Sequence, residues 1–172
     1  MGSLKLKLTI AYHGARYKGW QVQKSGITVQ QKVEEALKRF FPSADRVHSS
    51  SRTDTGVHAR GMVAHVEVQK DEFRIGELKL RLALNAFLPD DVSVTEVKRV
   101  PANFHARFDA TGKQYRYMIW NHPALNPLQR EVSWHVPREL DFLRMQEGAK
   151  FFIGNHDFRA FAVKREYEMR ST

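Results

Sequence analysis

The sequence contains no cysteine among its 172 residues. Disulfide bonds, thiolate zinc sites and cysteine nucleophiles are therefore excluded, and any chemistry must come from carboxylates, histidines, hydroxyl groups or the backbone. Long apolar runs are also missing. None approaches the ~20 residues that a membrane-spanning helix needs, and the N-terminus lacks the apolar stretch of a signal peptide. We expect a globular, cytoplasmic protein that has no membrane partner.

The charge balance is strongly basic. The chain carries 28 Lys and Arg against 19 Asp and Glu, a formal net charge of +9. Lys and Arg that neutralise phosphates release condensed counterions, so a surplus of this size favours nucleic acid as a partner. A basic protein without such a partner is the alternative, because net charge bears on association and not on fold.

The first hundred residues predict a βαββαβ order. Strands are predicted from period-two alternation and helices from apolar spacing of three and four, with a capping-box pattern at Thr28 and Gln31. The predicted elements are strand 4–10, helix 29–40, strand 47–51, strand 64–68, helix 75–86 and a strand from 92. This order is typical of a ferredoxin-like unit, in which two helices cover one face of an antiparallel sheet.

The rest of the chain predicts only part of a second unit. After a linker over 100–108, alternation at 115–119 predicts a strand, and residues 140–152 have helical spacing. One strand and one helix cannot close a sheet, so we expect strands after residue 172 or from another chain, and otherwise an apolar helix face open to water. The fold class is therefore α+β. Residues 1–100 form the ferredoxin-like N-terminal domain, and 101–172 form a partial second domain.

The segment 50–59 is longer and more polar than a hairpin connection requires. Its carboxylate, Asp54, is flanked by Arg52, two threonines and Gly56. A guanidinium and backbone N–H groups favour the ionised carboxylate that a nucleophile or base needs. The plainer interpretation is an aspartate that accepts hydrogen bonds within its own turn.

Six motifs resemble those of the TruA-type tRNA pseudouridine synthases, in the family's order and over nearly the whole chain. Residues 52–59, RTDTGVHA, resemble the signature RTDxGVHA. The others are YKGWQ at 17–21, NAFLP at 85–89, FHARF at 104–108, KQYRY at 113–117 and GNHDFRAF at 154–161. The resemblance implies the pseudouridine synthase fold and isomerisation of uridine to pseudouridine in tRNA. In that reaction the glycosidic bond breaks and C5 of the rotated base joins the ribose. No cofactor or metal is implied.

The resemblance also implies roles for particular residues. Asp54 corresponds to the essential aspartate, which begins the reaction at C1′, at C2′ or on the base. Arg52 would hold the carboxylate or occupy the place of the flipped base, and Tyr115 would stack beneath the uracil, which recovers part of the unstacking cost. The residues expected to contact RNA are Lys18, Trp20, Gln21, His58, Arg60, Arg107, Lys113 and Arg116.

Family members with these motifs act at about positions 38 to 40 of tRNA. We therefore expect the anticodon arm as the partner and a homodimer in the full-length protein. They also continue through an FxxxMVRN-type segment whose arginine helps to complete the site. This sequence has no such segment, so we expect a shortened chain with weak or no activity alone.

Two other interpretations remain open. The first is a noncatalytic RNA-binding module of ferredoxin-like fold, or an inactive fragment of the synthase; the aromatic signature of an RRM is absent from 64–68, which favours the enzyme. The second is a metal site built from Asp54, His58 and His65. No third ligand stands at a recognisable spacing, and His65 is expected to point outward from its strand.

Overall fold

The computed structural model describes residues 2–161 of the chain. Its contacts divide the chain into two compact units, Met1–Gln114 and Tyr115–Thr172, which we describe separately. The sequence-based domain boundary after residue 100 differs from this division, and residues 162–172 of the expected second domain lie outside the described residues. Within 2–161, no helix has both the length and the apolar character that crossing a membrane requires.

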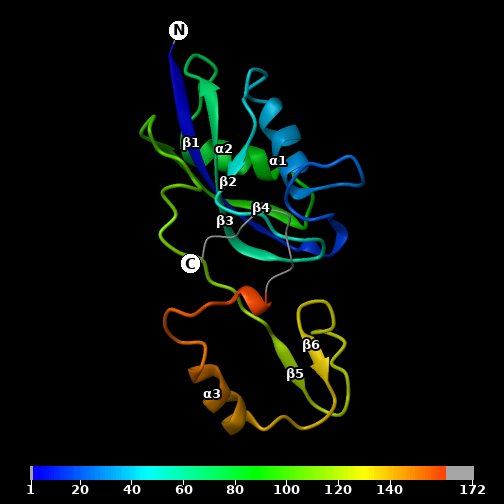
Figure 1. Cartoon of the computed structure of the whole chain (residues 1–172). Helices are drawn as coiled ribbons and strands as arrows, with labels where there is room; N and C mark the ends of the chain where they lie inside the picture. The colour runs from blue at the N-terminus through cyan, green and yellow to red at the C-terminus, as the bar shows by residue number, and fades with distance from the viewer. Residues whose placement is uncertain (1, 162–172) are drawn as a thin grey trace. The chain divides into compact units, whose positions relative to one another are not determined.

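The first unit is a four-stranded sheet with two helices (Figure 1). Its elements are β1 (Ser3–Tyr12), the short 3-10 helix η1 (Gly14–Arg16), α1 (Val29–Lys38), β2 (His48–Ser49), β3 (Ala59–Gln69), α2 (Glu77–Asn85) and β4 (Val92–Val100). The strands lie in the order β2-β3-β1-β4, and every neighbouring pair is antiparallel. The predicted α+β class and antiparallel sheet are confirmed.

The core of this unit follows from the alternation in the sequence. In β1, Leu6, Leu8 and Ile10 are fully buried, and they form one cluster with the apolar faces of both helices. Helix α1 begins as predicted, because the Thr28 hydroxyl accepts a hydrogen bond from the backbone N–H of Gln31. Burial of a full leucine or isoleucine side chain is worth about 2 kcal/mol, so this cluster stabilises the unit.

The opposite face of the sheet is partly covered by the segment that follows β4. Lys5 donates from Nζ to the carbonyl oxygens of Ala102 and Phe104, and the Ala106 N–H donates to Nδ1 of His65 at 3.1 Å. The expectation that His65 points into solvent is therefore wrong, since it is only 5% exposed. This packing also explains why residues 101–114 group with the first unit.

His65 lies in a small histidine cluster on this face. The His48 and His105 rings lie 5.2 and 4.7 Å from the His65 ring, measured between centroids. Burial, and then the nearby His105, His48 and Lys5, lowers the pKa of His65 to about 4. His65 is thus neutral near pH 7, which leaves Nδ1 free to accept the Ala106 hydrogen bond.

The second unit has little regular structure. Strand β5 (Ile119–Asn121) pairs in parallel with β6 (Trp134–Val136), and α3 (Phe142–Lys150) begins at Asp141, which accepts from the Arg144 N–H; a short 3-10 helix, η2 (Arg159–Phe161), follows. The strand predicted at 115–119 is largely wrong. Its ladder begins only at Ile119, because residues 115–117 pair with no strand among residues 2–161.

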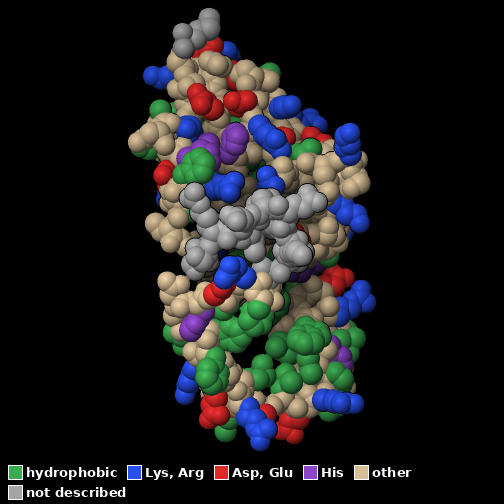
Figure 2. Space-filling view, viewed as in Figure 1, with side chains coloured by type: hydrophobic (Ala, Val, Ile, Leu, Met, Phe, Trp, Pro, Cys, Tyr) green, Lys and Arg blue, Asp and Glu red, His purple; other side chains and the backbone are tan. Residues whose placement is uncertain are grey.

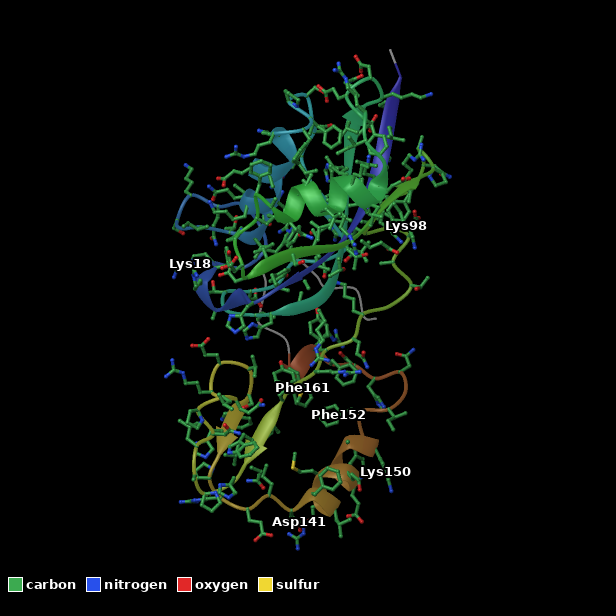
Figure 3. The ribbon with its side chains drawn as sticks, turned by 180° about the vertical axis from the view of Figure 1, so that it is seen from behind. Lys18, Lys98, Asp141, Lys150, Phe152 and Phe161 are labelled. Carbon is green, nitrogen blue, oxygen red and sulfur yellow. The ribbon has the colours of Figure 1, made fainter. Side chains whose placement is uncertain are left out.

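No residue of the second unit is buried within 115–161. Phe142, Met145 and Phe152 are exposed, as the sequence predicted for an apolar helix face that is open to water. Figure 2 shows hydrophobic side chains at the surface of this unit. Phe152 and Phe161, both labelled in Figure 3, contact each other edge to face with centroids 5.9 Å apart. Such ring pairs tie the segment together without forming a core.

Candidate active site

The polar segment between β2 and β3 presents Asp54 at its tip. Asp54 is exposed, whereas the preceding Thr53 is half-buried. A hydrogen bond of 3.2 Å from the Val57 N–H to the Asp54 carbonyl closes a turn, and Gly56 has a φ of 80° within it. The carboxylate is thus accessible on a backbone that is itself folded into a defined turn.

A second segment, residues 12–20, holds this turn through hydrogen bonds. The Trp20 N–H donates to the Thr53 carbonyl at 3.1 Å, and the Gly56 N–H donates to the Tyr17 carbonyl at 3.3 Å. The end of β1 adds a side-chain contact, because the hydroxyls of Tyr12 and Thr53 are hydrogen-bonded at 2.8 Å. We call residues 12–20 the support segment.

The two segments approach so closely that glycine is required. A Cβ on Gly19, which has a φ of 81°, would lie 2.5 Å from the carbonyl oxygen of Thr53. A Cβ on Gly14 would lie 2.0 Å from the carbonyl oxygen of Val57. Neither distance is compatible with a side chain unless the backbone moves.

Asp91, in the turn before β4, anchors the support segment to the rest of the sheet. Its carboxylate accepts a short hydrogen bond from the Tyr17 hydroxyl, and its carbonyl accepts from the His13 N–H at 2.8 Å. Arg16 Nε lies 3.4 Å from the same carboxylate. Burial, and then the Asp91 carboxylate, raises the pKa of the Tyr17 phenol, so this hydroxyl remains a donor at neutral pH.

The structure changes the expectation for Arg52. Both Arg52 and Asp54 are exposed, and within residues 2–161 no ion pair joins their side chains. The expected hold of this guanidinium on the carboxylate therefore does not take the form of an ion pair among these residues, and it stays a prediction. The other expected role, in the place of a flipped base, stays a prediction.

Within the first unit, the residues expected to contact RNA fall into three groups. Trp20 is only 1% exposed, and its ring centroid lies 6.0 Å from that of Tyr12, so its indole is not accessible for the expected contact with RNA. Gln21 and His58 are half-buried; Nδ1 of His58 accepts from the Gly14 N–H at 3.0 Å and so holds the support segment. The exposed members of the first unit are Lys18 (Figure 3), Arg60, Arg107 and Lys113.

Tyr115 and Arg116 belong to the second unit. Both are exposed, Tyr115 by 68%. An exposed phenol ring is available for stacking, which is the property the expected role needs. Their participation in the site stays a prediction.

Sequence reasoning missed the residues that hold the turn. Tyr12, Thr53 and Asp91 are not distinctive by type, and their partners stand far away in the sequence. Tyr12 did carry a signal, because it continues the buried alternation of β1 into the loop. Among the described residues, no group of three or more His, Asp or Glu side chains could hold a metal ion.

An exposed carboxylate on a fixed turn can act as a nucleophile or as a base toward a bound molecule. The hydrogen bonds that hold the turn are made by its backbone and by the Thr53 and His58 side chains, while the Asp54 side chain is exposed. The first unit therefore supplies one reactive carboxylate on a turn whose backbone is fixed, and it also carries exposed cations.

Comparison with known proteins agrees with this arrangement. Residues 8–109 match the family model described as tRNA pseudouridine synthase. The chain is 45% identical over 159 residues to "tRNA pseudouridine synthase A" of Geotalea daltonii, covering 91% of this chain and 63% of the relative. The same name belongs to relatives in Akkermansia muciniphila, 43% identical over 96% of this chain and 62% of the relative, and in Solidesulfovibrio magneticus, 48% identical over 91% and 58%.

The matched region contains β2, β3, β4 and the second half of β1, together with the support segment and the turn that carries Asp54. The chain spans about 63% of the length of curated relatives such as that of Geotalea daltonii. The match to the family model and the extent of the identity together show that this chain belongs to the tRNA pseudouridine synthase family.

Proposed function

We propose that the protein isomerises uridine to pseudouridine in tRNA and that Asp54 is its catalytic carboxylate. The observation that carries the proposal is the exposed Asp54 side chain on a turn whose backbone is fixed by the support segment. A reacting group held this way does not have to be ordered when substrate binds, which lowers the barrier. The family named above supplies the reaction class.

The isomerisation leaves the atomic composition of the nucleotide unchanged. The bond from C1′ to N1 breaks, a bond from C1′ to C5 forms, C5 loses its proton, and N1 ends with a hydrogen. Asp54 would begin this sequence at the ribose or on the base. Arg52 would occupy the space left by the flipped base, and Tyr115 would stack beneath the uracil.

The proposed substrate site is the anticodon arm, at about positions 38 to 40. The formal charge of +9 and the exposed cations Lys18, Arg60, Arg107 and Lys113 of the first unit favour a polyanionic partner. We further propose a ferredoxin-like arrangement for the first unit, supported by the strand order β2-β3-β1-β4. A cytoplasmic location and a homodimer in the full-length protein complete the proposal.

The direct test is release of tritium from tRNA labelled at uridine C5. We expect the shortened wild-type chain to release tritium weakly and Asp54→Asn to release none, because the variant lacks the carboxylate but keeps the size of the side chain. Asp71→Asn is the matched control, since Asp71 is also exposed in the first unit but lies in the turn after β3. Equal rates for wild type and Asp54→Asn would reject the catalytic role of Asp54.

The same proteins distinguish an enzyme from a binding module. Filter binding to tRNA should be similar for wild type and Asp54→Asn, because one exposed carboxylate contributes little to phosphate contacts. Binding should weaken steeply as salt rises from about 50 to 200 mM, because the release of counterions from the RNA is less favourable at higher salt. Salt-sensitive binding without any tritium release by wild type would favour the noncatalytic module or an inactive fragment of the synthase.

A further inference from the structure

We propose that Tyr12 is a positioning residue that sets the orientation of Asp54 through its hydrogen bond to Thr53. This inference rests on the proposed function, because it assigns Asp54 as the group to be positioned. Tyr12 is the last residue of β1, the strand that pairs with both β3 and β4. Strand β1, which is paired on both edges, thus ends in a residue that is hydrogen-bonded to the residue before Asp54.

Thr53 is fixed at two separate points. Its hydroxyl is 2.8 Å from the Tyr12 hydroxyl, and its carbonyl accepts from the Trp20 N–H at 3.1 Å. The first contact fixes the side chain and the second fixes the peptide plane that leads into Asp54. With the Val57 to Asp54 bond on the other side of the turn, the backbone at Asp54 is constrained both before and after the residue.

The surroundings of Tyr12 make the hydroxyl contact specific. Tyr12 is 5% exposed, and its ring lies against Trp20, so water has little access to replace Thr53 as partner. Burial also raises the pKa of the phenol, which stays protonated over the range in which a carboxylate can act. A buried hydroxyl that lost Thr53 would be left without a partner, so the pair favours one arrangement of the turn.

The test separates positioning from general packing by changing each partner of the bond. Tyr12→Phe removes the phenol oxygen, Thr53→Val removes the other oxygen with nearly the same shape, and Thr53→Ser retains a hydroxyl. Thr95→Val is the matched control, because it deletes an exposed threonine hydroxyl that donates to the Thr9 carbonyl in the same sheet. All variants are made in the full 172-residue chain, and circular dichroism confirms that each is folded.

Tritium release from C5-labelled tRNA gives the first readout. We expect Tyr12→Phe and Thr53→Val each to lower kcat about tenfold with little change in KM, since a misplaced reacting group affects the chemical step more than binding. The double variant, Tyr12→Phe with Thr53→Val, should be no slower than either single variant, because each substitution removes the same hydrogen bond. Thr53→Ser and Thr95→Val should keep wild-type rates. Multiplicative losses, or a rise in KM that accounts for the effect, would overturn the proposal.

Amide hydrogen exchange gives a readout that does not depend on activity. The Trp20 N–H, which donates to the Thr53 carbonyl, should exchange about tenfold faster in Tyr12→Phe and Thr53→Val and unchanged in Thr95→Val. If this chain released no tritium, hydrogen exchange would still test the support of the turn, separately from the proposed function. Wild-type exchange rates at Trp20 in both variants would overturn the positioning role in either case.

Discussion

The two units of this chain differ in how they use apolar residues. In the first unit, large apolar side chains from three strands and two helices are fully buried in one cluster. In the second, over residues 115–161, none is buried, although phenylalanine is plentiful there. Apolar content therefore does not make a core unless enough elements surround it, and a parallel pair of three-residue strands with one helix does not.

The comparison also locates the chemistry. The turn that carries Asp54 stands on the unit with the packed sheet, where strand β1 and the support segment fix its backbone. A catalytic group needs such support, because small displacements reduce rates strongly. If only the first unit has a packed core, substitutions in the two units should differ in their effect on stability.

The largest difference in stability between the units is expected when a large apolar side chain is truncated in each of them. Leu8→Ala, at a fully buried position in β1, should lower the free energy of unfolding by about 3 kcal/mol through lost burial and a cavity. Phe142→Ala in α3, where the ring is 67% exposed, should cost less than about 1 kcal/mol. Urea unfolding followed by circular dichroism measures both. Equal losses would mean that the second unit has a core after all.

Replacement of Gly19 should destabilise the support segment. Gly19→Ala forces a side chain into a φ of 81° and toward the Thr53 carbonyl, and we expect a loss of about 2 kcal/mol. Gly112→Ala is the control, because a Cβ there meets open space; its change in midpoint should be close to zero. Thermal unfolding of the three proteins gives the comparison. A neutral Gly19→Ala would show that the two segments can separate without cost.

The buried histidine should make the first unit sensitive to acid. Because the folded pKa of His65 is about 4 and the unfolded chain binds the proton more readily, stability falls as pH drops from about 6.5 toward 4. Between pH 7 and pH 5.5 this one group should remove about 1 kcal/mol from the free energy of unfolding. Urea midpoints measured at both pH values report the loss.

Two variants identify the source of that acid sensitivity. His65→Asn should reduce the difference between the two pH values, since its amide oxygen can still accept from Ala106 but does not titrate in this range. His48→Asn should keep most of the difference, because burial of His65 is the larger cause of its lowered pKa. The reverse pattern would assign the effect to the exposed neighbour.

The smallest effect on stability concerns the surface of the second unit. Phe152→Ser should change the free energy of unfolding by less than about 0.5 kcal/mol. It should nevertheless lower the fluorescence of the dye ANS, which binds exposed apolar clusters such as the contact between Phe152 and Phe161. Leu78→Ser is the control: Leu78 is 63% exposed but lies on the well-packed first unit. Equal fluorescence losses would indicate that the dye does not distinguish the units.

Local patterns predicted most of the first unit. The alternation at 4–10 and the Thr28 cap define β1 and α1, because strand burial and helix capping depend on residues close in sequence. Trp20 and His65 were misassigned since their burial depends on segments more than thirty residues away, namely the Asp54 turn and the 101–109 segment. Alternation at 115–119 predicted a strand, but a ladder needs a partner that alternation cannot supply.

The candidate site divides in the same way. The motif around Asp54 made that residue recognisable, and its exposure fits the expected role. The hydrogen bond between Tyr12 and Thr53 could not be predicted, because it joins residues 41 positions apart through a register that only the folded sheet defines. Residue types indicate which chemistry is available, whereas long-range pairing determines how firmly it is held.

The central place of β1 has a consequence for synthesis on the ribosome. This strand leaves the exit tunnel before its neighbours β3 and β4, which begin only at Ala59 and Val92. At roughly 5–20 residues per second, β1 waits several seconds with both edges unpaired, and its alternating leucines are then open to chaperones or to a neighbouring nascent chain. Since Tyr12 closes this strand, the support of Asp54 cannot be assembled before residue 92 has emerged. A stall or a slow codon between 69 and 92 should therefore lower the yield of native protein more than one placed after residue 121.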